Sequence, residues 1–129
     1  MKTYKLQKHG PLLVVKTCVV GSEGMAYPNL LVDTGSAYTI LSQEILYSIG
    51  LSPADAKKKL RRIITGSGHE IVPVISVHQF HCLGQRVDNF DLLAYTLPSG
   101  IYVDGLLGMD FLNRFDIDLS ISTGKVFIK

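Results

Sequence analysis

Residues 30–36 read LLVDTGS, so an apolar run that favours a β-strand leads straight into a carboxylate, a hydroxyl residue and a glycine. Such a strand would carry Asp33 inward, and Gly35 would let neighbouring backbone amides approach the carboxylate closely. That arrangement is typical of a reactive carboxylate. The same small and polar residues also form ordinary turns at strand ends, so this segment alone leaves both interpretations open.

A second segment, GLLGMDFL at residues 105–112, has two apolar residues followed by a glycine and a short helical pattern. Residues 64–71, ITGSGHEI, form a hairpin pattern with glycine at its turn. Together with LLVDTGSAYTILS at residues 30–42, these segments resemble the retropepsin-like aspartic proteases, the single-domain relatives of the retroviral enzymes. The resemblance covers nearly the whole chain from Pro11 onward, and it is nearer to cellular and bacterial members than to viral ones.

The family resemblance implies an all-β fold, a small closed β-barrel of the acid-protease type with one or two short helices, in a single domain over residues 1–129. The residue pattern agrees, because it predicts many short strands. These lie around 4–6 and over 12–20, 25–32, 37–41, 71–82, 86–95, 117–121 and 126–128. Predicted helices begin at Ser42 with a stop at Gly50, at Ser52–Asp55, and over 109–115.

For the active-site loop, the resemblance assigns roles residue by residue. It implies that Asp33 is the catalytic carboxylate and that Thr34 hydrogen-bonds across a subunit boundary. It further implies that Gly35 permits the tight loop, and that the Ser36 hydroxyl supports the carboxylate.

The resemblance also implies a flap, a hairpin that closes over the substrate. The predicted flap comprises Ile64, Thr65, Gly66, Ser67, Gly68 and His69. Gly66 and Gly68 suit its turn because glycine tolerates positive φ.

The resemblance implies that Leu106, Leu107 and Gly108 of the second motif pack behind the active-site loop and help to line the substrate pockets. Met109 stands where retroviral enzymes usually have an arginine, so the viral dimer contacts made by that arginine are not expected here.

The number of catalytic carboxylates points to two subunits. Hydrolysis by this route needs two carboxylates that share a proton around one water, but the chain has one Asp-Thr-Gly and no Asp-Ser-Gly. Asp104 precedes a glycine but belongs to the second motif, which makes it a poor partner. We therefore expect a second copy of Asp33 in a homodimer with the site on its two-fold axis. By family analogy, the terminal hairpin over 117–128 is the expected interface.

These features predict an endopeptidase that acts on a polypeptide substrate without a metal, a cofactor or a covalent intermediate. The pH–rate profile is expected to be a bell on the acid side of neutrality, because two adjacent carboxylates do not both ionise easily. If Ser36 donates to the ionised carboxylate, its loss should move the acidic limb to higher pH. The alternative function is a non-catalytic dimerisation or peptide-binding module that retains the fold.

Composition excludes several other classes of protein. The 129 residues are 47% apolar and 19% charged, which fits one domain with a buried core. A net charge of +2 does not favour nucleic acid as a partner. No apolar run is long enough to span a bilayer and no signal-peptide pattern appears, so a cytoplasmic location is the expectation. Two cysteines, Cys18 and Cys82, are too few for a disulfide framework.

Three local patterns have alternative interpretations that the residues do not favour. His78, His81 and Cys82 could suggest zinc, but on a strand His81 faces away from the other two. The basic residues within 57–62 lack interleaved aromatics, so they are interpreted as a solvated helix face. Residues 65–68 lack the Gly-Lys-Ser/Thr ending of a phosphate-binding loop.

Overall fold

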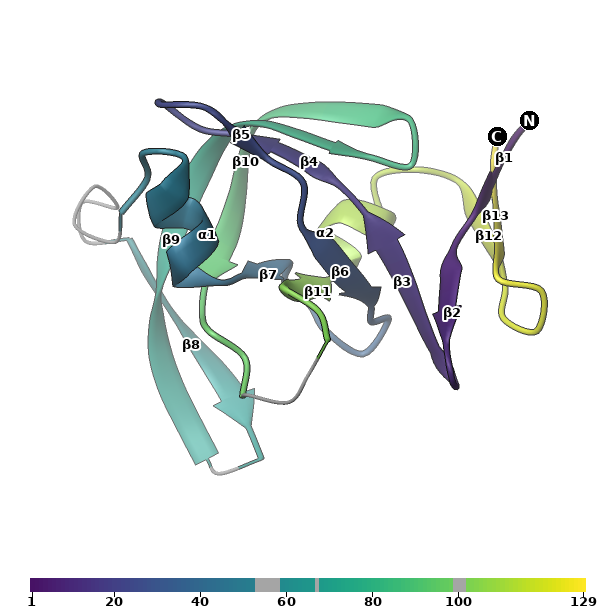
Figure 1. Ribbon diagram of the computed structural model, residues 1–129. Coiled ribbons are helices and arrows are strands. Elements are labelled where there is room, and N and C mark those ends of the chain that lie inside the picture. Colours follow the sequence, from purple (N-terminus) through teal and green to yellow (C-terminus); the bar gives the residue numbers. More distant parts are fainter. Residues whose placement is uncertain (53–58, 67, 99–101) are drawn as a thin grey trace.

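The structure of the protein is a computed structural model that describes residues 1–52, 59–66, 68–98 and 102–129. The regular secondary structure of the described residues is almost all β, with two short helices (Figure 1). The strands are β1 (Lys2–Lys5), β2 (Gln7–His9), β3 (Leu12–Lys16), β4 (Cys18–Val20), β5 (Met25–Ala26), β6 (Asn29–Val32), β7 (Ile40–Leu41), β8 (Leu60–Thr65), β9 (Gly68–Cys82), β10 (Gln85–Ala94), β11 (Gly105–Leu107), β12 (Ile117–Ser120) and β13 (Lys125–Ile128). The helices are α1 (Gln43–Ser48) and α2 (Met109–Leu112).

Some predicted features lie outside the described residues. They are the helix start after Ser52, two lysines of the basic cluster (Lys57 and Lys58) and Ser67 of the hairpin.

The main sheet is open among the described residues. Its strand order is β2-β3-β6-β11-β7-β10-β9-β4-β5, and no ladder joins β2 to β5. The expected closed barrel is therefore not found. The 15-residue strand β9 only partly belongs to this sheet, because only its residues 74–82 pair with β10. Residues 68–73 of β9 pair instead with β8 in a hairpin that projects from the sheet (Figure 1).

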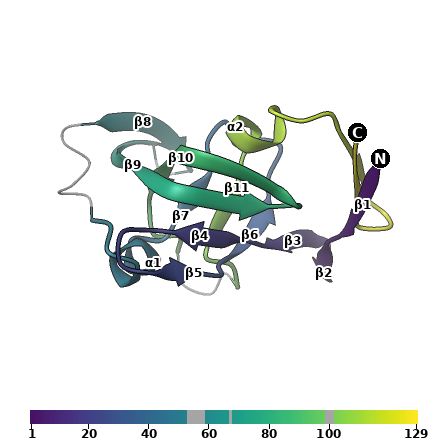
Figure 2. The same cartoon turned by 90° about the horizontal axis from the view of Figure 1, so that it is seen from above.

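A second sheet of three strands, in the order β1-β13-β12, joins the two ends of the chain. It lies at the opposite end of the molecule from the β8–β9 hairpin, as both views show (Figures 1 and 2). The predicted terminal hairpin is present as β12 and β13. Strand β13 is central, however, because β1 pairs with its other edge. Both edges of the C-terminal strand are thus occupied within the chain.

Two predicted strands are each divided in two by one contact. The run 12–20 breaks into β3 and β4 at Thr17, and the run 25–32 breaks into β5 and β6 around Pro28. The backbone N–H and the hydroxyl of Thr17 both donate to the Pro28 carbonyl, at 3.0 and 2.9 Å. Since Pro28 has no N–H of its own, a regular ladder cannot continue through this point.

Both helices are short, and their ends have local causes. The Ser42 side chain caps α1 by accepting the N–H of Ile45 at 3.3 Å, and Gly50 beyond its end has φ of +85°, as the cap and stop signals predict. Helix α2 is only four residues long, shorter than the predicted 109–115. Phe115 still packs on Phe111, with ring centroids 5.1 Å apart. Neither described helix combines the length and the apolar character that crossing a membrane requires.

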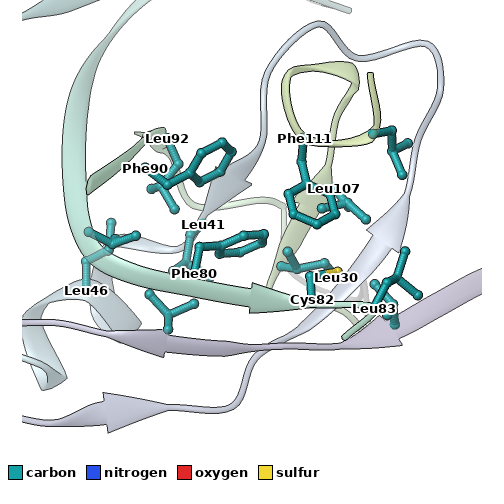
Figure 3. Close-up of a cluster of buried hydrophobic side chains, with 14 of the residues drawn as sticks. Leu30, Leu41, Leu46, Phe80, Cys82, Leu83, Phe90, Leu92, Leu107 and Phe111 are labelled. Carbon is teal, nitrogen blue, oxygen red and sulfur yellow. The ribbon is translucent and has the colours of Figure 1, made fainter. Parts of the chain in front are cut away.

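The core has a large cluster and a small one. In the large cluster, Phe80 stacks on Phe90 at 4.9 Å and meets the edge of Phe111 at 5.3 Å, surrounded by aliphatic side chains from most of the sheet (Figure 3). The small cluster lies beneath the β8–β9 hairpin. Its buried residues are Ile40, Val72, Val74 and Leu93, against which Tyr38, Ile63, Tyr95 and Leu106 pack.

Candidate active site

Strand β6 ends one residue before Asp33 and delivers this carboxylate, half-buried, to the start of a tight turn. The backbone N–H of Asp33 donates to the Leu107 carbonyl at 3.0 Å. The N–H of Gly35 donates to Asp33 Oδ1 at 2.9 Å, and a Cβ at Gly35 would lie only 3.3 Å from the same oxygen. Gly35 therefore brings a backbone donor close to the carboxylate, as the sequence predicted.

Strand β11 lies between the two strands that flank this turn. It pairs parallel with β6 and antiparallel with β7. This close packing requires glycine at the start of β11 and at the position directly after its end. A Cβ at Gly105 would collide with the Ile40 carbonyl oxygen, and one at Gly108 would collide with the backbone of Tyr38. The second motif is thus a neighbour of the first in space, far from it in sequence.

A buried polar bracket, which the sequence reasoning missed, holds the two motifs together. Thr39 is fully buried, and its N–H and hydroxyl donate to the two carboxylate oxygens of Asp110 at 2.9 and 2.7 Å. The Thr39 hydroxyl also accepts the N–H of Gly108 at 3.1 Å. The sequence hints at this bracket only by placing one polar residue, Thr39 or Asp110, next to the apolar residues of each motif. Their pairing is visible only once the strands are neighbours.

Ser36 does not support the carboxylate in the way that the family resemblance implied. Its hydroxyl donates to the Tyr38 carbonyl at 2.7 Å, and a hydroxyl has a single proton to donate. Ser36 therefore braces the turn and leaves Asp33 to the Gly35 amide. Thr34 is exposed, and its side chain makes no hydrogen bond within the described residues. Its predicted bond across a subunit boundary stays a prediction.

A cavity of about 640 Å³ brings the separate parts of the candidate site together. Asp33 borders it, and it is the only carboxylate among the described residues that do so. The remaining lining residues are mostly apolar or aromatic: Gly35, Ser36, Ala37, Tyr38, Ile40, Arg62, Ile63, Ile64, Gly66, Leu93, Tyr95, Leu97, Pro98 and Leu106. An extended, largely apolar ligand would fit such walls.

Of the predicted residues of the second motif, one lines the cavity and the others pack inside the protein. Leu106 lines the cavity as predicted, whereas Leu107 is fully buried in the main core, behind the active-site turn (Figure 3). Gly108 likewise lies against the turn and does not line the cavity.

Sequence reasoning missed the wall formed by residues 93–98, because nothing in its pattern marks it as lying near Asp33. The structure places it there by pairing β10 in parallel with β7.

The predicted hairpin at 64–71 is present and extends further than the motif did, over β8 and the start of β9. Gly68 has φ of +127°, as expected for its turn, but Gly66 does not have positive φ. Of the predicted hairpin residues, Ile64 and Gly66 border the cavity, whereas His69 is exposed and outside it.

The basic cluster is not a helix face in its described part. Arg61 and Arg62 lie on β8. Lys59 pairs with Asp91, with Nζ and Oδ2 2.6 Å apart.

Two other residues with candidate chemistry have structural positions. The Asp104 carboxylate accepts the N–H of Asn29 at 2.9 Å, at the start of β6 and hence at the opposite end of that strand from Asp33. It is therefore not the partner of Asp33 within one chain. The Cys82 side chain lies in the main core, where burial raises the pKa of its thiol to about 12.

The turn at the end of a strand, the interleaved second motif and the cavity that they border together with the β8–β9 hairpin are the arrangement of an aspartic protease. The chain belongs to the aspartyl protease family, whose model matches residues 17–111. Its fold is similar to the crystal structure of a retropepsin-like aspartic protease from Rickettsia conorii, with a TM-score of 0.72. That match covers 98% of this chain and 89% of the other at 17% identity, so the likeness concerns the fold alone. No curated protein sequence matches the chain.

Proposed function

We propose that the chain is an endopeptidase that hydrolyses peptide bonds with a water activated by two copies of Asp33 across a homodimer. The observation that carries the proposal is the position of Asp33 at the edge of the large apolar cavity that the β8–β9 hairpin also borders. Membership of the aspartyl protease family supports proteolysis in general.

In the proposed dyad, one Asp33 is protonated and its partner is ionised. The protonated carboxyl polarises the carbonyl of the peptide bond, and the carboxylate removes a proton from the attacking water. The Gly35 amide already donates to Oδ1 of Asp33. Because two adjacent carboxylates give up their protons in two separate steps, activity is expected between those steps, on the acid side of neutrality.

The substrate we propose is an extended polypeptide with apolar side chains near the cleaved bond. Tyr38, Ile40 and Leu106 form apolar walls close to Asp33. The β8–β9 hairpin would act as a flap that closes over the bound peptide and excludes bulk water. Main-chain hydrogen bonds to an extended peptide would let alternate side chains enter the cavity.

The second copy would approach beside Thr34. A hollow of about 310 Å³ is bordered by Asp33, Thr34, Leu119 and Ile121, together with apolar residues of β3 and β6. The neighbouring strand β12 has no partner on its outer edge among the described residues, whereas β13 is paired on both edges. We therefore propose β12, and not β13, as the part of the terminal hairpin that meets the partner.

The substitution Asp33→Asn tests the proposed function. The amide keeps the size of the side chain but cannot alternate between proton donor and carboxylate, so hydrolysis of a quenched fluorescent peptide library should be abolished while the fold is kept. Asp88→Asn, at an exposed position of β10 where the aspartate pairs with Arg86, is the matched control and should retain full activity. Equal cleavage by Asp33→Asn and wild type would exclude the mechanism. Peptide binding without cleavage by wild type would favour the non-catalytic module.

A further inference from the structure

The β8–β9 hairpin touches the wall of the cavity through two tyrosines, one for each strand. On β8, the guanidinium carbon of Arg61 lies over the ring of Tyr38, 5.1 Å from its centroid. On β9, the carboxylate of Glu70 accepts a hydrogen bond from the hydroxyl of Tyr95. Both tyrosines lie on the body of the molecule and both line the cavity that Asp33 borders.

The strand register places Arg61 and Glu70 on the same face of the hairpin. Residues directly opposite in an antiparallel pair share a face, and successive residues alternate. Arg61 is opposite Val72, and Ile63 is opposite Glu70. Val72 is buried in the small core cluster and Ile63 packs against it, so this face turns toward the body.

The other face of the hairpin is exposed. Its apolar residues Leu60, Ile64 and Ile71 have 60, 81 and 63% of their surface accessible. The hairpin is therefore held from one side, by the small apolar cluster and by the two tyrosine contacts.

The second contact combines packing with electrostatics, because Tyr95 also packs against the small cluster that contains Val72 and Val74 of β9. The hydrogen bond to Glu70, followed by burial and by the negative charge of Glu70, raises the pKa of Tyr95 above its usual value. The raised pKa favours the protonated tyrosine, which is the form that donates a hydrogen bond to Glu70. Its backbone N–H donates to the Leu41 carbonyl at 3.0 Å, which fixes the tyrosine to β7.

We propose that the pairs Arg61–Tyr38 and Glu70–Tyr95 are two clamps, one for each strand, that set the position of the hairpin over the cavity. The four residues are positioning residues. That the clamped hairpin serves as a flap rests on the proposed function. Because Tyr38 and Tyr95 also line the cavity, a ligand that moves either ring also changes the hold on the hairpin.

Hydrogen exchange of the full-length protein without substrate tests the clamps directly. Arg61→Gln removes the cation and keeps a polar stem, and Tyr95→Phe removes only the hydroxyl and leaves the ring in its cluster. Each change should speed exchange of the amides in residues 60–73 by about two- to five-fold, and the double variant by about ten-fold. Arg61→Lys, which keeps a cation, should restore most of the protection.

The matched controls lie away from the hairpin. Arg86→Gln removes an exposed arginine that pairs with Asp88, and Tyr47→Phe removes the hydroxyl of an exposed tyrosine on α1. Neither should change exchange in 60–73. If Arg61→Gln does not fold, hydrogen exchange of the isosteric Tyr95→Phe variant in residues 60–73 tests the proposal by itself. Unchanged exchange in Tyr95→Phe and in every folded Arg61 variant overturns the proposal.

Measuring KM and kcat of the clamp variants then distinguishes a positioning role of the four residues from a purely structural role. With the quenched peptide library, loss of either clamp should raise KM several-fold and leave kcat within about two-fold, because the covered state of the cavity is less populated. A fall in kcat with KM unchanged would contradict the positioning role. If wild type cleaves no peptide but the variants show faster amide exchange in residues 60–73, the clamps are supported and the proposed protease activity is contradicted.

Discussion

The surroundings of Asp33 are built by its immediate neighbours in the chain. Gly35 approaches the carboxylate within a hydrogen-bond distance because it has no side chain, and the Ser36 backbone closes the turn by donating to the Asp33 carbonyl at 3.2 Å. Distant residues also hold this turn, because the Asp33 N–H donates to the Leu107 carbonyl at 3.0 Å and the Ser36 carbonyl accepts the Met109 N–H at 2.8 Å. The distant residues decide where it points.

We expect Ser36→Ala to leave the acidic limb of the pH–rate profile where it is. The hydroxyl donates to the Tyr38 carbonyl and not to Asp33, so its loss removes a brace of the turn at a cost of about 1 kcal/mol in the free energy of unfolding. The measurement is kcat/KM against pH for both proteins, beside urea unfolding. A shift of the acidic limb to higher pH would return Ser36 to the supporting role that the family resemblance implied.

The thiol of Cys82 should be unreactive in the folded protein. The thiolate is the reactive form, and burial raises the pKa of this thiol from 9.0 to about 12. Iodoacetamide at pH 8.5 should therefore leave Cys82 unmodified until urea is added, as judged by mass spectrometry. The half-buried Cys18 serves as the internal comparison. Native alkylation of Cys82 as fast as in urea would contradict its burial.

The same raised pKa predicts a loss of stability at high pH. Between about pH 9 and 12 the unfolded chain releases this proton while the folded chain retains it, so the free energy of unfolding falls as the pH rises through that window. Cys82→Ala removes the titrating group. Its free energy of unfolding should fall less than that of wild type between pH 8 and pH 10.5.

At the scale of elements, the site depends on how closely β11 fits between β6 and β7. Gly108, where β11 passes into α2, has no room for a side chain, since a Cβ would meet the Tyr38 backbone and come within 3.0 Å of the Ser36 carbonyl oxygen. The active-site turn and the second motif are therefore a single packed unit.

Gly108→Ala should lower the free energy of unfolding by about 1–3 kcal/mol and reduce activity, because the backbone of the active-site turn must shift to admit the methyl group. Denaturant unfolding measures the first effect and peptide cleavage the second. Gly66→Ala is the control for stability, since a Cβ there meets nothing within 4 Å. Equal stability of Gly108→Ala and wild type would show that the turn can move away from this contact at no cost.

At the scale of the whole molecule, the described residues of one chain place one carboxylate at the cavity. Among the described residues, the outer edge of β12 has no partner strand, and Ile121 is exposed beside the hollow at Thr34, which is where we propose that a second copy docks. That residues 1–129 form one domain stays a prediction.

Activity per chain should rise with protein concentration in step with dimer formation, followed by sedimentation velocity. In the proposed dimer, Ile121→Lys would place one added positive charge from each chain near the two-fold axis. It should therefore weaken dimer formation and lower the activity per chain. Met25→Lys introduces the same charge at an exposed site on β5 and should change neither dimer formation nor the activity per chain. A fully active monomer would contradict the two-fold model.

Several features follow from short stretches of sequence alone. The turn at Asp33, the cap of α1 at Ser42, the glycine turn of the β8–β9 hairpin and the pairing of β12 with β13 were all predicted. Each depends on residues a few positions apart, whose local geometry a pattern records directly. The family too was recognisable from three such stretches, and it is confirmed.

Only the tertiary structure decided the features that join distant strands. The Thr39–Asp110 bracket, the tyrosine contacts beneath the hairpin, the open sheet and the central place of β13 depend on which strands become neighbours. A strand's own pattern shows which of its faces is buried, but not the partner that covers that face or the edge it pairs with. Those choices are made by packing over the whole chain, which is why Thr39 and Asp110 become partners although they lie 71 positions apart in the sequence.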